Sequence, residues 1–247
     1  DLIAAEDTRH TKQLLMAYDI DTPLTSYHEH NKAEKGPQLI EKLQDGQMIA
    51  LVSDAGMPAI CDPGSDMVRL ALEADIPIVP LPGANAGLTG LIASGMDTTR
   101  FTFVGFLPKT QKHRLPALQS VEAYEGTLIF YEAPHRIRQV LGEMQEVLGD
   151  RRAVLCRELT KRYEQYLHGR LSELQTALSE QGTRGEFVIL VEGMTKTAEE
   201  ADPENVDYAA LVRELMEQGV DKKEAVRTVA RRCGVPKRSV YQAALSL

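Results

Sequence analysis

The chain has 247 residues and a formal net charge of −8, with an ordinary mixture of apolar and charged side chains. This length allows a sizeable hydrophobic core and two domains, and no uncharged apolar run approaches the roughly 18 residues of a membrane-spanning helix. The three cysteines, Cys61, Cys156 and Cys233, are odd in number and far apart. This pattern disfavours a disulfide framework and a clustered zinc site, and it indicates a reducing, cytoplasmic setting.

Apolar runs alternate with amphipathic stretches through the first hundred residues. Strands are predicted at 2–5, 48–52, 76–81 and 101–105, and helices at 11–18, 37–44, 66–74 and 84–94. This alternation predicts an α/β fold with a mostly parallel sheet in an N-terminal domain, residues 1–106. Because the chain begins at Asp1 inside a predicted strand, we expect a native N-terminal segment to precede it.

Strand and helix signals mix in residues 107–194, which predicts a second, α+β domain. Its strands are predicted at 127–131, 153–157 and 187–191, and its helices at 115–123, 135–148 and 172–179. Residues 195–206 are polar, contain one proline and lack an apolar period, so they are predicted to form a linker.

The last segment, residues 207–247, has a helical pattern and a charge opposite to that of the rest. It contains eight Lys or Arg against five Asp or Glu, a net charge of +3, which leaves −11 on residues 1–206. Asp221 is predicted to cap a helix, and Gly234 and Pro236 to separate it from the next. Ala230, Gly234 and Val240 also have the spacing of a helix-turn-helix.

Two interpretations of this basic tail are open. It is either a small helical bundle with a solvated basic face or a domain that contacts nucleic-acid phosphates. The basic side chains concerned are Lys222, Lys223, Arg227, Arg231, Arg232, Lys237 and Arg238.

Two loops predict a ligand crevice. Residues 53–64 follow a predicted strand, and Gly56 and Gly64 there allow a ligand to approach main-chain N–H groups. Residues 82–86 follow the next predicted strand, and ligands of open α/β sheets bind at such carboxyl ends. Neither a Gly-x-Gly-x-x-Gly fingerprint nor a P-loop is present. The acidic, proline-rich loops instead suit a cationic ligand with an amino group and a ribose diol, such as S-adenosylmethionine.

A series of motifs, in order along the chain, resembles one known group of proteins. The motifs lie at 1–11, 51–58, 62–64, 80–83, 105–108, 128–136 and 157–161. Together they resemble the bacterial ribosomal RNA ribose methyltransferases of the tetrapyrrole methylase superfamily, over essentially the whole chain including the helical tail. That family opens with a strand and a Pro-Thr-Pro-Ile-Gly-Asn-Leu type loop, and nothing like it is visible before Asp1.

The resemblance implies a two-domain α/β methyltransferase, usually a homodimer, that binds S-adenosylmethionine between its domains. We expect no bound metal. The implied substrate is the 2′-hydroxyl of a cytidine in the decoding region of small-subunit (16S) ribosomal RNA. The implied cofactor-binding residues are Asp54, Ala55, Gly56, Met57, Pro82, Gly83, Asn85, Ala86, Tyr131 and Glu132.

A polar cluster follows the first predicted strand. A ribose hydroxyl is a poor nucleophile until a base withdraws its proton, while alignment supplies most of the remaining rate. We predict Glu6 or Asp7 as the proton acceptor, with Arg9 orienting the carboxylates or contacting a phosphate. The alternative is that Asp7 merely caps a helix and Arg9 pairs with it locally.

Further polar residues are candidate RNA contacts. His28, Glu29 and Asn31 could contact the substrate, but a hydrogen-bonded loop is the simpler and favoured explanation, and a zinc site at His28 and His30 has poor spacing. Lys161 could contact RNA or pair with Glu164. The predicted interdomain loop adds phosphate contacts or solvated charges at Lys109, Lys112, His113 and Arg114.

Two other functions compete with methylation of RNA. One is a methyltransferase for a tetrapyrrole or another small molecule, against which the basic tail argues. The other is a ribosome-associated RNA-binding protein without catalytic activity, which would not bind S-adenosylmethionine.

Overall fold

The structure, a computed structural model, describes residues 1–194, 207–217, 219–233 and 235–246. The predicted linker at 195–206 and the predicted turn residue Gly234 lie outside the described residues. The chain divides into two compact units, Asp1–Gly193 and Met194–Leu247. None of the helices described is long and apolar enough to span a bilayer.

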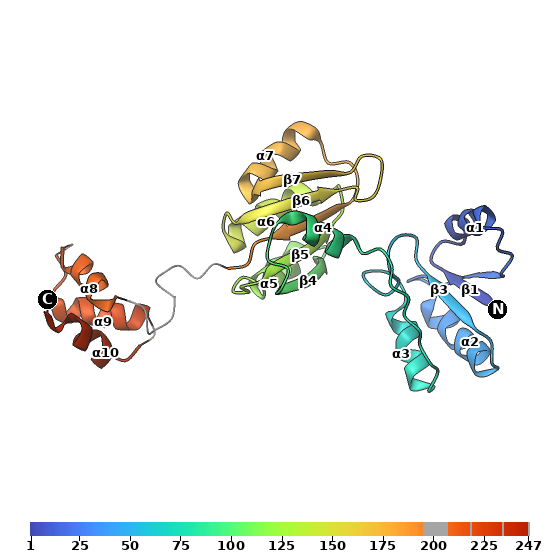
Figure 1. Cartoon of the computed structure of the whole chain (residues 1–247), viewed down its shortest axis with the longest axis horizontal. Coiled ribbons are helices and arrows are strands. Elements are labelled where there is room, and N and C mark those ends of the chain that lie inside the picture. The colour runs from blue at the N-terminus through green and yellow to red at the C-terminus, as the bar shows by residue number, and fades with distance from the viewer. Residues whose placement is uncertain (195–206, 218, 234, 247) are drawn as a thin grey trace. The chain divides into compact units, whose positions relative to one another are not determined.

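A small parallel sheet begins the first unit (Figure 1). Strand β1 (Leu2–Ala5) lies between β2 (Leu24–Ser26) and β3 (Ile49–Val52), parallel to both. Its buried core joins Ala4 and Tyr27 to Leu39 and Met67. The helices of this part are α1 (Thr8–Ala17), α2 (Lys32–Gln44) and α3 (Ser65–Glu73). The predicted parallel sheet is therefore confirmed, with β2 as an additional short strand.

One strand predicted for this part is absent, and another joins the second sheet. Residues 76–81 form no strand, because Pro77 and Pro80 have no N–H to donate to a ladder. Strand β4 (Phe101–Phe106) pairs with β5 (Thr127–Glu132) instead of joining the first sheet. The division between the two sheets consequently falls before α4 (Ala86–Ser94), which packs on the second sheet, and not at residue 106.

The second sheet has five strands in the order β4-β5-β8-β6-β7. Strand β5 is parallel to β4 and antiparallel to β8 (Phe187–Val191), and β6 (Arg152–Arg157) is antiparallel to both of its neighbours, β8 and β7 (Gln165–Arg170). This mixed pairing confirms the predicted α+β character.

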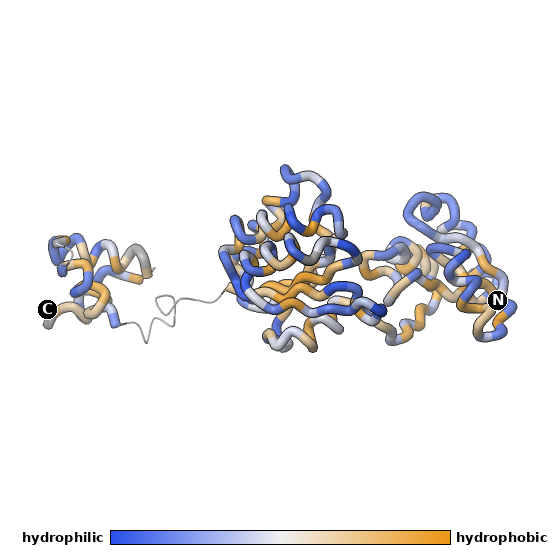
Figure 2. The backbone as a smooth tube through the Cα atoms, turned by 90° about the horizontal axis from the view of Figure 1, so that it is seen from above, coloured by the Kyte–Doolittle hydropathy of each residue, from blue (hydrophilic) through white to orange (hydrophobic). Residues whose placement is uncertain are grey.

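Both faces of the central strands β5 and β8 are covered, so these two strands are mostly apolar (Figure 2). Leu128 and Phe130 face one core with α5, α6 and α7, whereas Ile129 lies on the other side with Leu91 of α4. This alternation follows from the period of two in a strand. The covering helices are α5 (Gln111–Gln119), α6 (Ile137–Leu148) and α7 (Leu171–Gln181).

In its described residues, the second unit contains three helices and a short 3-10 turn. Asp221 caps α9, since its side chain accepts a hydrogen bond from the Lys223 N–H at 3.1 Å. Ala230 and Val240, two of the helix-turn-helix positions, are buried in the core of the unit. The elements are α8 (Tyr208–Glu217), α9 (Lys222–Arg232), α10 (Lys237–Ala243) and the turn η1 (Ala244–Ser246).

Candidate cofactor and RNA site

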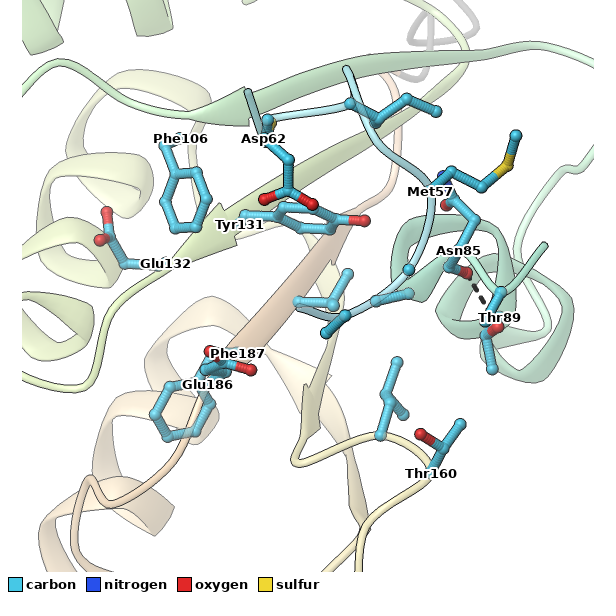
Figure 3. A pocket seen from close by; sticks show the side chains of 18 of the residues that line it. Met57, Asp62, Asn85, Thr89, Phe106, Tyr131, Glu132, Thr160, Glu186 and Phe187 are labelled. Carbon is cyan, nitrogen blue, oxygen red and sulfur yellow. Dashed lines mark hydrogen bonds between the residues drawn. The ribbon is translucent and has the colours of Figure 1, made fainter. Parts of the chain in front are cut away.

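A cavity of about 370 Å³ lies in the first unit, beside the aromatic ring of Tyr131 (Figure 3). Its wall includes residues 55–57 and 60–62, the start of α4, the ends of β4 and β5, and residues 159–161 and 186–188. Its size falls within the range of pockets that bind small molecules and cofactors. The two loops predicted to form one crevice, 53–64 and 82–86, therefore do border a single cavity.

Seven of the ten predicted cofactor residues line this cavity, namely Ala55, Gly56, Met57, Asn85, Ala86, Tyr131 and Glu132. Asp54, Pro82 and Gly83 do not. The carboxylate of Asp54 is turned towards α1, where it accepts a hydrogen bond from the Asp7 N–H at 3.2 Å and contacts His10 Nδ1 at 3.2 Å. Asp54 thus ties the cavity loop to the end of β1.

Gly56 brings the two cavity loops into contact. Its φ of 81° is in the left-handed region, and a Cβ at this position would lie 3.2 Å from the carbonyl oxygen of Ala84. Both the conformation and the close approach require a residue without a side chain. The glycine predicted from the sequence for ligand approach is therefore also required for loop packing.

Tyr131 connects β5 to the beginning of α4. Its hydroxyl accepts a hydrogen bond from the Gly87 N–H at 2.8 Å, and the Asn85 side chain accepts one from the Leu88 N–H at 2.9 Å. Burial raises the pKa of Tyr131, so the phenol stays neutral. Phe103 and Phe106 pack edge-to-face on its ring, with centroids at 5.0 and 5.6 Å. The ring is consequently a fixed wall of the cavity.

Glu132 is buried and already paired. Arg136 donates to its carboxylate from Nε at 2.9 Å and from Nη2 at 3.0 Å, and the Ala133 N–H donates at 2.7 Å. Both oxygens are therefore engaged within the protein, and Glu132 brings no free charge to the cavity.

Sequence reasoning missed several cavity residues. Asp62 and Glu186 contribute carboxylates, and Lys161, predicted as an RNA contact, lies in the same wall. The Asp62-Pro63-Gly64 turn was a signal for Asp62, but Glu186 comes next to the cavity only through the strand order. The other missed lining residues are Ile60, Cys61, Ala84, Thr89, Phe106, Ala133, Pro134, Leu159, Thr160, Phe187 and Val188.

The cluster after β1 separates into two carboxylates with different partners. Asp7 caps α1, accepting from the Arg9 N–H at 2.8 Å, and Arg9 Nη2 lies 2.6 Å from its Oδ2. The Arg9 guanidinium holds the pKa of Asp7 well below its usual range. Glu6 instead accepts from the Asp54 N–H at 3.3 Å. Asp7 therefore caps the helix and Arg9 pairs with it locally, as the alternative prediction for these two residues states.

Asp7, His10 and Asp54 also bring their donor atoms within 4.8 Å of one another, close enough to share a cation. Each of the three side chains already has a protein partner, because Asp7 pairs with Arg9 and His10 contacts Asp54.

The segment with His28, Glu29 and Asn31 is a hydrogen-bonded loop. The Asn31 side chain accepts from the His28 N–H at 2.9 Å and donates to Ser26 Oγ at 3.0 Å. Glu29 pairs with Lys32 at 2.8 Å. These contacts agree with the simpler of the explanations offered for this segment.

Arg114 is not available to RNA, and its prediction as a phosphate contact is wrong. Only 2% of the residue is exposed, and its guanidinium forms an ion pair with the buried Glu143 of α6. It also donates to the carbonyls of Pro108 at 3.2 Å and Lys109 at 2.9 Å. Helix α5 turns this side chain inwards, whereas Lys109, Lys112 and His113 remain exposed.

Lys161 does not pair with Glu164, because residues 158–164 are not helical. Its Nζ lies 3.1 Å from Glu158 and 2.9 Å from Glu186. In the second unit, Lys223, Arg227, Lys237 and Arg238 are exposed and Lys222 is half-buried. The side chains of Arg231 and Arg232 lie outside the described part of the structure.

The sequence pattern of the family described as Tetrapyrrole (Corrin/Porphyrin) Methylases matches residues 1–175. The chain belongs to this family. A second pattern, described as the RsmI C-terminal HTH domain, matches residues 202–247 of this methylase. The predicted helix-turn-helix tail is thereby confirmed.

Curated relatives of this methylase share one name. The Ribosomal RNA small subunit methyltransferase I of Halalkalibacterium halodurans is 49% identical over 98% of this chain and 84% of its own length. The protein of the same name from Bacillus subtilis is 47% identical over the same shares. The resemblance predicted from the ordered motifs is confirmed, and this tetrapyrrole methylase belongs with these proteins.

Solved structures confirm the tetrapyrrole methylase fold. The uroporphyrin-III C-methyl transferase of Thermus thermophilus, complexed with S-adenyl homocysteine, has a TM-score of 0.51 and 17% identity over 77% of this chain and 84% of its own. Cobalt precorrin-4 methyltransferase has a TM-score of 0.56 and 18% identity over 77% and 83%.

Proposed function

We propose that this protein transfers a methyl group from S-adenosylmethionine to the 2′-oxygen of a cytidine ribose in small-subunit (16S) ribosomal RNA. The observation that carries the proposal is the combination, in one chain, of the cavity beside Tyr131 and a basic helix-turn-helix unit. The names of relatives that are 47–49% identical to nearly the whole chain support it.

The cavity fits the proposed cofactor. Gly56 leaves main-chain groups open to a ligand, Tyr131 offers an aromatic wall, and Asp62 offers negative charge to a cationic molecule. When bound, S-adenosylmethionine supplies an electrophilic methyl group on a positively charged sulfur. The residues that would hold it are Ala55, Gly56, Met57, Asn85, Ala86 and Tyr131.

Glu6 is the proton acceptor in this proposal. It directly follows β1, and its carboxylate accepts a hydrogen bond from the Asp54 N–H at 3.3 Å, next to Ala55 of the cavity wall. Asp7 is a weaker base because Arg9 stabilises its ionised form. Glu6 would take the proton of the 2′-hydroxyl as the oxygen attacks the methyl carbon, while Arg9 keeps the Asp7 cap in place.

Substitution of Glu6 tests this role. Loss of a general base costs about 10²–10⁴ in rate, so Glu6→Gln should lower kcat by at least about 100-fold without changing cofactor affinity. Asp7→Asn is the matched control because Asn caps helices as well as Asp does. Equal losses of rate and cofactor affinity in Glu6→Gln would make Glu6 a structural residue.

The function itself is tested by methyl transfer in vitro. Purified full-length protein, labelled S-adenosylmethionine and either naked small-subunit RNA or assembled subunits should give one 2′-O-methylated cytidine, mapped by mass spectrometry. Cells lacking the protein should lack that modification. Methylation of a tetrapyrrole but not of RNA, or no binding of S-adenosylmethionine at all, would contradict the proposal.

A homodimer completes the proposal. Apolar side chains of α4 and β4 are exposed in the isolated chain, with Ile92 at 78% and Phe106 at 52%, and burial of such a surface favours association. Sedimentation should show a dimer that Ile92→Glu weakens.

We also propose a cytoplasmic location, where the substrate would be found. The proposed reaction is independent of metal ions, so EDTA should leave its rate unchanged.

A further inference from the structure

Asp62 projects into the cavity from a strained turn. Its neighbours Ala59 and Cys61 are not glycines, yet their φ angles are 67° and 61°, a backbone conformation that persists only where the surrounding structure enforces it. In Figure 3 the Asp62 carboxyl group is drawn over the ring of Tyr131, and its charge contributes to the raised pKa of that tyrosine. The turn therefore places a carboxylate at the cavity wall.

The other charged groups of the cavity wall compensate one another. Glu132 is paired with Arg136, and Glu186 is paired with Lys161. Within the part of the chain that the structure describes, no ion pair includes Asp62. The cavity therefore carries one carboxylate without a cationic partner.

Like charges surround this carboxylate. Burial is the largest cause of its pKa of about 6, and the charges of Glu6, Asp54 and Glu186 raise it further. At neutral pH the group is mostly ionised, and a cation placed in the cavity would relieve the repulsion from these neighbours. Ser53 opposes the shift by hydrogen bonding to the ionised form.

We propose that Asp62 determines the preference of the cavity for the positively charged cofactor over its neutral product. This inference rests on the proposed function. Methyl transfer forms a bond between the ribose oxygen and the methyl carbon and breaks the bond between that carbon and sulfur. The electron pair of the broken bond stays on sulfur, which loses its positive charge, and the hydroxyl proton passes to the base. S-adenosylhomocysteine therefore carries one positive charge fewer than S-adenosylmethionine.

The ionised Asp62 therefore favours binding of S-adenosylmethionine over S-adenosylhomocysteine, which promotes replacement of the product by fresh cofactor. An ionised Asp62 attracts the sulfonium of the cofactor but gains nothing from the neutral thioether of the product. Contacts common to both ligands, such as those with the adenosine and amino-acid parts, cancel in the ratio of their dissociation constants. A change in this ratio on substitution thus reports the charge of Asp62.

Calorimetric titration of the full-length protein with S-adenosylmethionine and with S-adenosylhomocysteine tests the inference. Asp62→Asn should weaken binding of the cofactor by about tenfold and of the product by less than about threefold. Asp62→Glu keeps the charge and should retain more of the preference. Glu186→Gln is the matched control, since it removes the same charge from the same wall where Lys161 already compensates it, and it should change the ratio less than about twofold.

A pH series on the unaltered protein provides a second measurement that does not depend on folding of a variant. The groups that face Asp62 are Glu6, Asp54, Cys61, Tyr131 and Glu186. The ratio of product to cofactor dissociation constants should fall as the pH drops from 8 through about 6, because Asp62 becomes protonated.

The outcomes separate this inference from the proposed function. If the unaltered protein binds neither ligand, the proposed function fails. If it binds both but Asp62→Asn weakens them equally, or if the ratio does not respond to pH, the function stands and the role of Asp62 is refuted. A selective loss of S-adenosylmethionine binding, together with the pH response, supports the role.

Discussion

Replacement of Arg114 by methionine tests whether this residue of α5 stabilises the fold or contacts RNA. The substitution removes two hydrogen bonds to Glu143 and leaves that carboxylate buried, with 5% of its side chain exposed. Charge-assisted hydrogen bonds contribute about 1.5–3 kcal/mol each, and loss of one partner of a buried ion pair costs about 3–5 kcal/mol. We expect the free energy of unfolding to fall by about 3–5 kcal/mol.

Urea titration followed by circular dichroism measures this change. For a unit of this size, each kcal/mol lost from the free energy of unfolding lowers the melting temperature by about 2–4 °C, so the melting temperature of Arg114→Met should fall by about 6–20 °C. Lys112→Met, an exposed change on the same helix, should stay within about 0.5 kcal/mol of the unaltered protein. Arg114→Met combined with Glu143→Leu should recover most of the loss, because both buried charges are then absent. A loss below about 1 kcal/mol in Arg114→Met would refute the reasoning.

Three further predictions concern the tail, the cavity and acid stability. Replacing Lys223, Arg227, Lys237 and Arg238 by Gln should weaken RNA binding. The logarithm of the binding constant should also fall less steeply with the logarithm of the salt concentration, by up to about 0.7 in slope per lost phosphate contact. An unchanged slope in filter-binding assays would contradict a role of the tail in RNA binding. Gly56→Ala should weaken cofactor binding in calorimetry, because a Cβ would lie 3.2 Å from the Ala84 oxygen. Gly46→Ala is the control, since φ is 86° there and no atom lies within 4 Å of the added Cβ; it should have the same backbone cost but leave cofactor binding unchanged. Because Arg114 lowers the pKa of Glu143 below its usual 4.5, that pair stabilises the fold above this pH, and urea titrations should show its contribution disappearing as the pH falls through the lowered value. A stability loss in Arg114→Met that does not depend on pH would contradict this prediction, because a Glu143 with an ordinary pKa gives no pH-dependent contribution.

Local patterns predicted most of the secondary structure, and their failures have physical causes. Residues 76–81 combine strand-forming Ile and Val with prolines, and the missing N–H groups prevented the pairing that the apolar side chains suggested. Strands β2 and β7 were missed because they are short or half-exposed and lack a strong period of two. Strand β4 was recognised, but sequence alone could not tell which of two sheets it would join.

The candidate site shows the same division. The loop after a buried strand predicted the crevice, the family resemblance supplied the individual cofactor residues, and seven of those ten residues do line the cavity. Arg114 was misassigned because a basic residue in a polar stretch gives no sign of a buried partner 29 positions away in Glu143. Asp7 was ambiguous because capping and catalysis both favour an acidic residue after a strand.

The sequence by itself determined the family, most of the strands and helices and the separate basic helical tail, since these depend on local periodicity and ordered motifs. Only the tertiary structure decided which charges are free. It paired Glu132 with Arg136, Glu186 with Lys161 and Arg114 with Glu143, and among the residues described it gave Asp62 of the cavity wall no cationic partner. The physical reason is that the charge state and accessibility of a side chain depend on burial and on neighbours that are distant in the chain.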